Sequence, residues 1–391
     1  VKEMTEILYP GNNFRIRCPN CMGCKECEKI QHDNSHEENE IIENSVILED
    51  ERNRIICSLP LIDGWQGMIS DTTAQAKYRI KKEVIKLNNY PVQRDELVEI
   101  FKKLMELGFI KRYDDLPPEE RKIVDEQQVR YTLPVSIAYK PDSVSTAVRL
   151  CMDASASSAG KASLNDCLYK GTTSFNMGNL ITRWRALNVG IASDLSKFYP
   201  SLRLRTEDWS LQFLWMIPSL QPTDPPELFV VTSLIFGVAS VAAQSEAAMK
   251  KIAMCYPDIR EVLESRYVDD LAMSVTKTTE AEGIKQRTTE VLTAYQLIPK
   301  GWSISRQTPD PKIAPDGLMT VGGLVWDVMR DTIKIKIPKF YFSKKIKGNM
   351  VGIRTFENGT LDELDSFFPR PLSTRALLAT MAKVYDSTGT L

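Results

Sequence analysis

The sequence predicts an α+β fold, and three observations support this. Several long segments carry apolar residues at helical spacing, while other segments are short β-type runs bounded by turn residues. The two kinds of segment alternate along the chain, and no internal repeat is visible. The chain has 391 residues, of which 43% are hydrophobic and 26% charged, as in an ordinary globular protein of about two or three domains.

The composition excludes several classes of protein. It is not that of a collagen-like, low-complexity or wholly disordered chain, and no stretch of about 18 apolar residues predicts a transmembrane helix. The first residues lack a signal-peptide layout and an initiator Met, so we expect a piece of a longer protein. Residues 1–60 hold 7 basic and 12 acidic side chains, and the remaining 331 hold 43 and 39. A phosphate-binding surface would therefore have to be a local cleft.

The elements follow from spacing and turn residues. Residues 28–54 are polar and acidic and indicate a linker, with order resuming near Leu59. Helical spacing is found in residues 72–89, 94–108, 174–187, 206–216, 227–256 and 279–296. Thr72 or Thr73 could cap the first of these helices, and Gly108 the end of the second. Strand patterns are found in Arg130–Tyr139, Thr146–Met152, Val189–Ser193 and residues 264–276 and 319–337.

Four cysteines stand at steps of three near the N-terminus, namely Cys18, Cys21, Cys24 and Cys27. Four thiolates at this spacing could wrap a tetrahedral zinc ion, and the spacing also approaches that of an iron–sulfur ligand run. The alternative is an exposed Cys-rich linker that binds nothing. The other four cysteines are scattered, which favours reduced thiols in an intracellular protein.

Paired acids in Tyr267-Val268-Asp269-Asp270 lie between two apolar arms, which predicts an antiparallel hairpin with the acids at its turn. A solvated Asp-Asp turn is the simpler interpretation. Asp194, however, ends a second apolar strand, where an unpaired charge is costly to bury. If this strand lies beside the hairpin, three carboxylates converge, and hard oxygen ligands select Mg²⁺ or Mn²⁺. The backbone carbonyl of Leu195 could add a ligand.

These residues resemble a reverse transcriptase. Tyr267-Val268-Asp269-Asp270 is similar to the family's metal-binding hairpin, and Asp194 with Tyr199 to its first catalytic motif. The segments that resemble the BEL/Pao group of long-terminal-repeat retrotransposons, in chain order, are 149–155, 163–166, 236–242, 300–302, 322–327 and 384–389. The Cys cluster is similar to the Cys-rich stretch between protease and polymerase in such polyproteins. The resemblance covers some 330 residues in the family's order.

The resemblance implies a right-hand fold with fingers and palm, an antiparallel palm sheet backed by helices, and only part of the thumb. Its implied boundaries are a Cys-rich segment and acidic linker (1–58), fingers with the first palm strands (59–188), palm (189–336) and a truncated palm-to-thumb region (337–391). It implies RNA-directed DNA polymerase activity, in which two Mg²⁺ or Mn²⁺ ions held by Asp194, Leu195, Asp269 and Asp270 serve transfer to a primer 3′-hydroxyl.

Further roles come from the same resemblance. Tyr199 would exclude a ribose 2′-hydroxyl, Arg149 would hold the triphosphate, and Lys300 would protonate the pyrophosphate leaving group. Gly237 would let the backbone approach the nucleotide, and Gln244 would contact template or nucleotide. Gly323 and Trp326 would grip the primer. The simpler alternatives are a core aromatic for Tyr199, a surface cation for Arg149, a packing glycine for Gly237 and a helix-surface amide for Gln244.

The implied partners are an RNA or DNA template with its primer, deoxynucleoside triphosphates, and the rest of a polyprotein (protease, RNase H, integrase), with no membrane. The implied location is intracellular and cytoplasmic, with virus-like particles and nuclear access as further options. One departure concerns the substrate motif, which has Ala242 where the family usually has Pro. This departure and the short thumb leave a second hypothesis open, a decayed or domesticated module that binds nucleic acid or protein without catalysis. A sister polymerase that copies RNA into RNA is a third, and Tyr199 argues against it.

Overall fold

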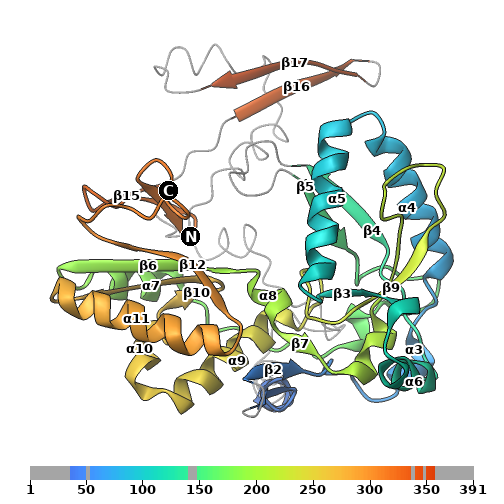
Figure 1. Cartoon of the computed structure of the whole chain (residues 1–391), viewed down its shortest axis with the longest axis horizontal. Helices are drawn as coiled ribbons and strands as arrows, with labels where there is room; N and C mark the ends of the chain where they lie inside the picture. The colour runs from blue at the N-terminus through green and yellow to red at the C-terminus, as the bar shows by residue number, and fades with distance from the viewer. Residues whose placement is uncertain (1–35, 50–52, 140–147, 336–339, 347–348, 357–391) are drawn as a thin grey trace, which may run out of the picture.

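The computed structural model describes residues 36–49, 53–139, 148–335, 340–346 and 349–356 (Figure 1). Helices and small sheets alternate along this part of the chain, so the predicted mixed α+β class is confirmed. Besides a helix over residues 36–44, the α-helices are α3 (Trp65–Met68), α4 (Thr73–Leu87), α5 (Pro91–Glu106), α6 (Pro118–Glu126), α7 (Met177–Arg185), α8 (Phe198–Ser201), α9 (Val241–Cys255), α10 (Arg260–Glu264) and α11 (Thr278–Ala294).

The strands form six separate sheets in the described part of the chain. They are β1 (Val46–Glu49), β2 (Arg54–Cys57), β3 (Ile110–Arg112), β4 (Val135–Tyr139), β5 (Val148–Met152), β6 (Val189–Ser196), β7 (Arg203–Leu204), β8 (Phe213–Met216), β9 (Glu227–Val231), β10 (Arg266–Tyr267), β11 (Asp270–Val275), β12 (Ile298–Ile304), β13 (Leu318–Val321), β14 (Leu324–Asp327), β15 (Thr332–Ile335), β16 (Phe340–Ile346) and β17 (Asn349–Phe356).

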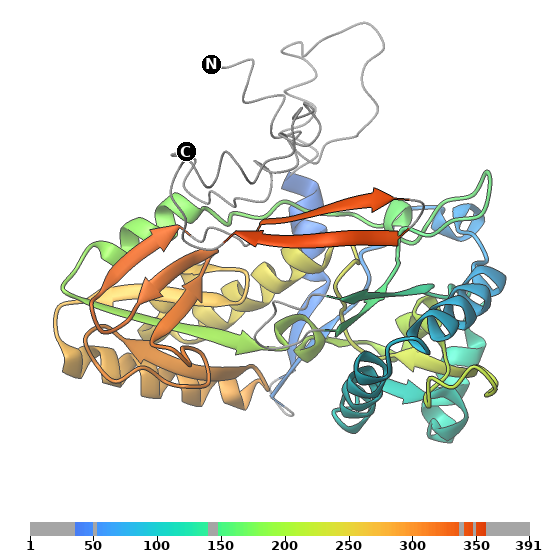
Figure 2. The ribbon, with the colours of Figure 1, turned by 90° about the horizontal axis from the view of Figure 1, so that it is seen from above.

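Figures 1 and 2 show two lobes joined through α8, α9 and β7. One lobe holds the four-stranded sheet β10-β11-β6-β12 with α7, α10 and α11, and the small sheet β13-β14-β15 lies beside it. The other lobe holds α4 and α5 with the sheets β3-β9-β8 and β4-β5. The hairpin of β16 and β17 stands apart from both lobes in Figure 1.

The four-stranded sheet is antiparallel, and β6 is a central strand between β11 and β12. Successive side chains of a strand point to opposite faces. On one face Ile191 and Leu195 join the main core, to which α9, α10 and α11 also contribute. On the other face Ala192 packs in a second cluster with Trp184 of α7 and Trp326 of β14. The small residues of this second face make room for α7 and for the β13–β15 sheet.

Several expected elements are confirmed with small shifts in their ends. The predicted helix 72–89 is α4, helix 94–108 is α5, helix 174–187 is α7 and helix 279–296 is α11. Gly108 follows α5 with φ 66°, as expected of a glycine after a helix C-terminus. The predicted strands 130–139 and 146–152 are β4 and β5, paired antiparallel with each other.

Two predicted helices are wrong in part. Residues 206–211 form a 3₁₀ helix, but Phe213–Met216 is strand β8, and Glu227–Val231 is strand β9. These two strands pair with each other antiparallel, and β9 also pairs with β3. Pairing with a distant segment decides the structure of such short apolar runs, and local spacing does not reveal it. Only the second half of 227–256 is helical, as α9.

The predicted linker 28–54 is also ordered in part. Residues 36–44 are helical, and β1 and β2 form a hairpin whose Val46, Ile55 and Cys57 are buried. Strand β2 pairs in parallel with β7, which ties the hairpin to the centre of the molecule. The acidic residues of the preceding helix dominate the composition of the segment and hide this short apolar pattern, although one of them, Glu38, is itself buried.

No helix in the described ranges has the length and apolar character needed to cross a bilayer. Cys57, Cys151, Cys167 and Cys255 are free thiols, as their scattered positions predict. The Cys18–Cys27 cluster and most of the predicted 337–391 region lie outside the described residues.

Candidate active site

The predicted acidic hairpin is present. Strands β10 and β11 pair antiparallel, with Tyr267 opposite Asp270, so Val268 and Asp269 form a two-residue turn. Val268 has φ 57°, a left-handed conformation that is a genuine outlier for a β-branched residue and costs about 1–3 kcal/mol. Arg266 donates from Nη1 to the carbonyl of Val268 at 2.9 Å, and the amide of Leu195 donates to the carbonyl of Asp269 at 3.0 Å. These bonds hold the strained turn in place.

Asp194 lies beside this hairpin, as the sequence predicts. Strand β11 pairs with β6, and Asp270 stands directly opposite Asp194. Residues opposite each other in an antiparallel pair point to the same face, with Cβ atoms about 4.5–5.5 Å apart. The face is the one that α7 and the β13–β15 sheet cover, because Ala192 and Ala272 occupy the next positions along it. Asp269 follows from the adjoining turn.

Two of the three carboxylates, Asp269 and Asp270, have raised pKa values. Burial raises the pKa of Asp269, and the nearby charge of Asp194 raises it further. Burial also raises the pKa of Asp270 to about 8, and the charges of Asp269 and Asp194 act in the same direction. The amide of Gly322 opposes this, since it donates a hydrogen bond to Oδ2 of Asp270 at 2.7 Å. The ionised forms of Asp269 and Asp270 thus lack enough positive charge around them.

Whether these residues suit a divalent cation can be judged from their contacts. Oδ1 of Asp194 is buried and has no hydrogen-bond partner, which is what a cation ligand leaves behind when its cation is removed. Oδ2 of Asp194 contacts Nζ of Lys300 at 2.5 Å, so the ammonium group of Lys300 balances the carboxylate charge that a cation would otherwise balance. In the described ranges, no group of three or more His, Cys, Asp or Glu side chains is arranged so that it could hold a metal ion as it stands. The acids thus match a cation site in residue type and strand register, and Lys300 is the competing charge.

Tyr199 stands next to this acidic group, on α8. Its side chain is buried, and its ring packs on Phe236 with centroids 4.6 Å apart. Burial raises the pKa of the phenol, and the charge of Asp269 contributes in the same direction, which indicates that the two side chains are near. Phe236 itself is 66% exposed, so the aromatic pair forms a wall between core and solvent beside the acids.

Gly237 follows Phe236 and has φ 104°, a conformation that L side chains rarely adopt. A Cβ atom here would lie 2.8 Å from the carbonyl oxygen of Met152, so only glycine lets this loop approach β5 so closely. Asn165 donates to the Gly237 carbonyl at 2.8 Å and fixes the loop. Arg149 is exposed on the same strand β5, three residues before Met152.

Gln244 lies away from any surface. Its side chain is fully buried in α9, where it donates to Ser45 and to the carbonyl of Ser58 and accepts from Ser240. It joins the β1–β2 hairpin to α9, so the expected contact with template or nucleotide and the surface alternative are both wrong.

Trp326 is likewise buried and packs edge-to-face on Trp184 at 5.1 Å. Its ring forms part of the second core cluster and is not open to a primer, whereas Gly323 does lie in the β13–β14 turn.

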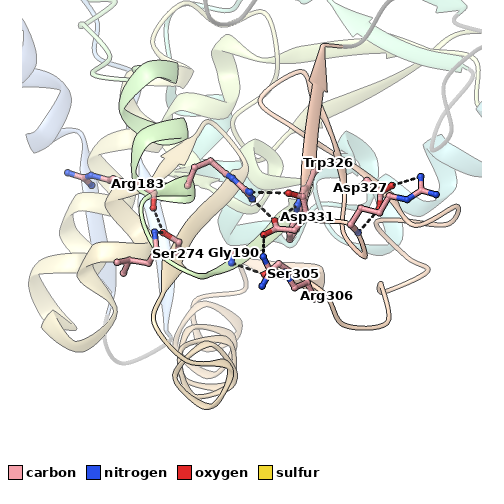
Figure 3. Close-up of polar contacts among 11 residues, drawn as sticks. Arg183, Gly190, Ser274, Ser305, Arg306, Trp326, Asp327 and Asp331 are labelled. Carbon is pink, nitrogen blue, oxygen red and sulfur yellow. Dashed lines mark hydrogen bonds and ion pairs between the residues drawn. The ribbon is translucent and has the colours of Figure 1, made fainter.

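Three residues to which the sequence assigned no role support the site. Gly322 donates to Asp270, Arg266 holds the turn, and Asp331 anchors the β13–β15 sheet. Figure 3 shows Asp331 with Trp326 and Arg306 around it. The Gly322-Gly323 pair signals a tight turn, but nothing local predicts which carboxylate that turn meets.

Comparisons with known proteins give limited results. No protein-family model matches the chain, and no curated protein does. Among solved structures, the chain is similar to a foamy viral protease-reverse transcriptase in complex with double-stranded DNA, with a TM-score of 0.44 and 14% identity over 72% of this chain and 38% of that one. It is also similar to the foamy viral protease-reverse transcriptase in complex with an RNA/DNA hybrid, with a TM-score of 0.39 and 16% identity over 59% of this chain and 25% of that one. In both cases the match spans less than half of the viral chain.

Proposed function

We propose that this chain is the RNA-directed DNA polymerase domain of a retroelement of the BEL/Pao type, which adds deoxynucleotides to a primer 3′-hydroxyl. The observation that carries the proposal is the register of β6 and β11, which sets Asp194 opposite Asp270 with Asp269 in the adjoining turn. In this proposal the four-stranded sheet is the palm and the lobe of α4 and α5 is the fingers.

Asp194, Asp269 and Asp270, with the carbonyl of Leu195, would hold two Mg²⁺ or Mn²⁺ ions. Such ions supply charge neutralisation at the attacking and leaving oxygens of an in-line phosphoryl transfer. The chain contributes the fixed positions of these acids. The bonds from Arg266 to Val268 and from Leu195 to Asp269 keep the turn from relaxing, so the carboxylates need little reorganisation.

The nucleotide would lie on the wall of Tyr199 and Phe236. A ring beside the acids would leave no room for a 2′-hydroxyl and so would select deoxynucleotides over ribonucleotides. Gly237 would let the backbone approach the nucleotide closely. Arg149 on β5 carries a planar guanidinium that could bind a triphosphate through two parallel hydrogen bonds. Template and primer would run across the same face. Zinc binding by Cys18, Cys21, Cys24 and Cys27 remains a prediction.

Lys300 would hold or give a proton at the candidate site. Its ammonium lies 2.5 Å from Asp194, and such a group can protonate a leaving oxygen.

A primer-extension assay on an RNA template with Mg²⁺ or Mn²⁺ tests the proposal. We expect extension by the wild-type chain and loss of at least about 100-fold in Asp270→Asn, as for removal of one electrostatic group at a reacting centre. Asp327→Asn is the matched control, because Asp327 pairs with Arg330 inside the β14–β15 hairpin and leaves the acids untouched. Equal extension by the wild-type chain and an Asp269→Asn, Asp270→Asn variant would reject catalysis by these acids.

The aromatic wall has its own test. Tyr199→Ala should raise the use of ribonucleotides relative to deoxynucleotides, whereas Tyr199→Phe keeps the ring and should keep the selectivity. If Tyr199→Ala left the preference for deoxynucleotides unchanged, the Tyr199 ring would have only a packing role in the core.

One observation favours the second candidate, a module that binds nucleic acid or protein without turnover. The ion pair of Lys300 with Asp194 already balances part of the acidic charge, which a cation would otherwise do. Binding of a template–primer duplex without any Mg²⁺-dependent affinity for triphosphates would establish that alternative.

A further inference from the structure

The turn between β13 and β14 reaches the acidic hairpin from outside the four-stranded sheet. Gly322 and Gly323 form this turn, with φ 54° and 84°, between the paired residues Val321 and Leu324. Positive φ at both central positions is the geometry of a type I′ turn. The amide of Gly322 points at Oδ2 of Asp270 and donates to it at 2.7 Å, across 52 residues of sequence.

The position of this amide depends on glycine. A Cβ atom on Gly322 would lie 2.3 Å from Cε and 2.7 Å from Sδ of Met177, the first residue of α7. Real contacts are never so short, so either the end of the Met177 side chain or the turn itself would have to shift. A side chain at Gly322 would also be strained at φ 54° whatever the space around it, so substitution should draw the amide off Asp270. Leu180 is the next neighbour at 3.7 Å, an ordinary contact. Met177 alone therefore sets the clearance.

The opposite end of the same small sheet is fixed to α7 by Asp331. Its carboxylate, 7% exposed, accepts from Arg185 Nη1 at 2.5 Å and from Trp326 Nε1 at 3.1 Å, and Arg306 Nη2 lies 3.7 Å away (Figure 3). Arg185 also donates to the main-chain carbonyl of Asp331 at 3.0 Å. The sheet is thus held at both ends, by Asp331 at one and by Gly322 at the other.

We propose that Gly322 is a positioning residue of the metal site, whose amide fixes Asp270 so that its other carboxylate oxygen faces Asp194, and that Asp331 keeps this amide in place. The inference rests on the proposed function. Groups that orient a ligating carboxylate set the affinity for the metal, and their loss costs about 10–100-fold in affinity or activity. A structural role alone would change stability but leave the metal affinity of the folded protein intact.

The test measures Mn²⁺ binding to the full chain by electron paramagnetic resonance, without nucleotide or primer. We expect Gly322→Ala to weaken Mn²⁺ affinity by about 10-fold or more. The double variant Gly322→Ala, Met177→Ala removes the atoms that the new Cβ would strike, and it should recover the part of the lost affinity that this clash causes. Near-ultraviolet circular dichroism verifies that each variant is folded.

A second pair of variants tests whether Asp331 keeps the Gly322 amide in place, and it decides the question if Gly322→Ala does not fold. Asp331→Ala should weaken Mn²⁺ affinity, whereas Asp327→Ala, on the same sheet but with its carboxylate bonded to Arg330, should leave it unchanged. Wild-type Mn²⁺ affinity in folded Gly322→Ala, or in folded Asp331→Ala, would overturn this inference alone. Absence of Mn²⁺ binding to the wild-type chain would overturn the proposed function as well.

Discussion

Removing the charge of Asp270 should stabilise the metal-free protein at neutral pH. The folded state holds the pKa of Asp270 at about 8, against 3.8 for the free side chain, because burial and the acids nearby disfavour its ionised form. The folded state therefore binds a proton that the unfolded state releases, and the stability falls as the pH rises from about 4 to about 8. Asp270→Asn abolishes this loss and can still accept the bond from Gly322.

The magnitude follows from the same pKa difference. At about 1.4 kcal/mol per pH unit, the full difference corresponds to nearly 6 kcal/mol above pH 8 as an upper limit. The side chain is only partly buried, so water screens part of this, and we expect a gain of about 1–3 kcal/mol at pH 7.5. At pH 4 the gain should nearly vanish, because the carboxyl is protonated in the folded state and half-protonated in the unfolded one.

Urea unfolding with EDTA at pH 4, 6 and 7.5 measures this effect, and Asp327→Asn is the control that should show no such trend. A gain that is equal at all three pH values, or a loss at pH 7.5, would refute the electrostatic reasoning. Saturating Mg²⁺ should reverse the order, since the cation stabilises the wild-type site and not the variant.

Three further outcomes are expected. Val268→Gly should raise the free energy of unfolding by up to about 1 kcal/mol, measured by urea titration, because glycine adopts the observed φ without strain; a destabilised variant would show that the lost core contact and the added chain entropy exceed the strain. Lys300→Gln should tighten Mn²⁺ binding while lowering the extension rate, because the ammonium competes for Asp194; weaker binding would contradict that competition. Gln244→Ala should lower the unfolding temperature and the free energy of unfolding, the latter by about 2–4 kcal/mol, because it leaves the hydrogen-bond partners of a buried amide unpaired. The KM for nucleotide should stay unchanged in the folded enzyme, and a raised KM would support a contact with the nucleotide after all.

The sequence predicted what depends on local pattern. The hairpin of Asp269 and Asp270 and the long helices α4, α5 and α11 follow from apolar spacing and turn residues. That the strand of Asp194 lies beside this hairpin was only a condition for three converging carboxylates, and the register of β6 and β11 meets it. No local signal separates β8 and β9 from helices, since only their pairing with each other and with β3 makes them strands.

Buried polar residues were the other source of error. Gln244 and Trp326 occupy positions that motif spacing assigns to nucleic acid, yet both face the interior and are satisfied there. A side chain's direction depends on what packs over it. Trp326 is covered by α7, and Gln244 by the β1–β2 hairpin, which comes from a segment whose acidic composition indicates a linker. The roles of these residues therefore could not follow from their spacing.

The unfavourable features of the site all lie on one hairpin and its nearest contacts. Val268 is strained, Asp270 is held where its charge is disfavoured, and Oδ1 of Asp194 has no partner. A protein selected only for stability would lose such features, because single substitutions remove each of them. Strain and uncompensated charge persist where the surrounding structure enforces them, and they gather at functional sites. We expect Val268→Gly and Asp270→Asn both to stabilise the chain. If Val268→Gly also weakens Mn²⁺ binding and Asp270→Asn abolishes it, the strain and the charge serve the same cation.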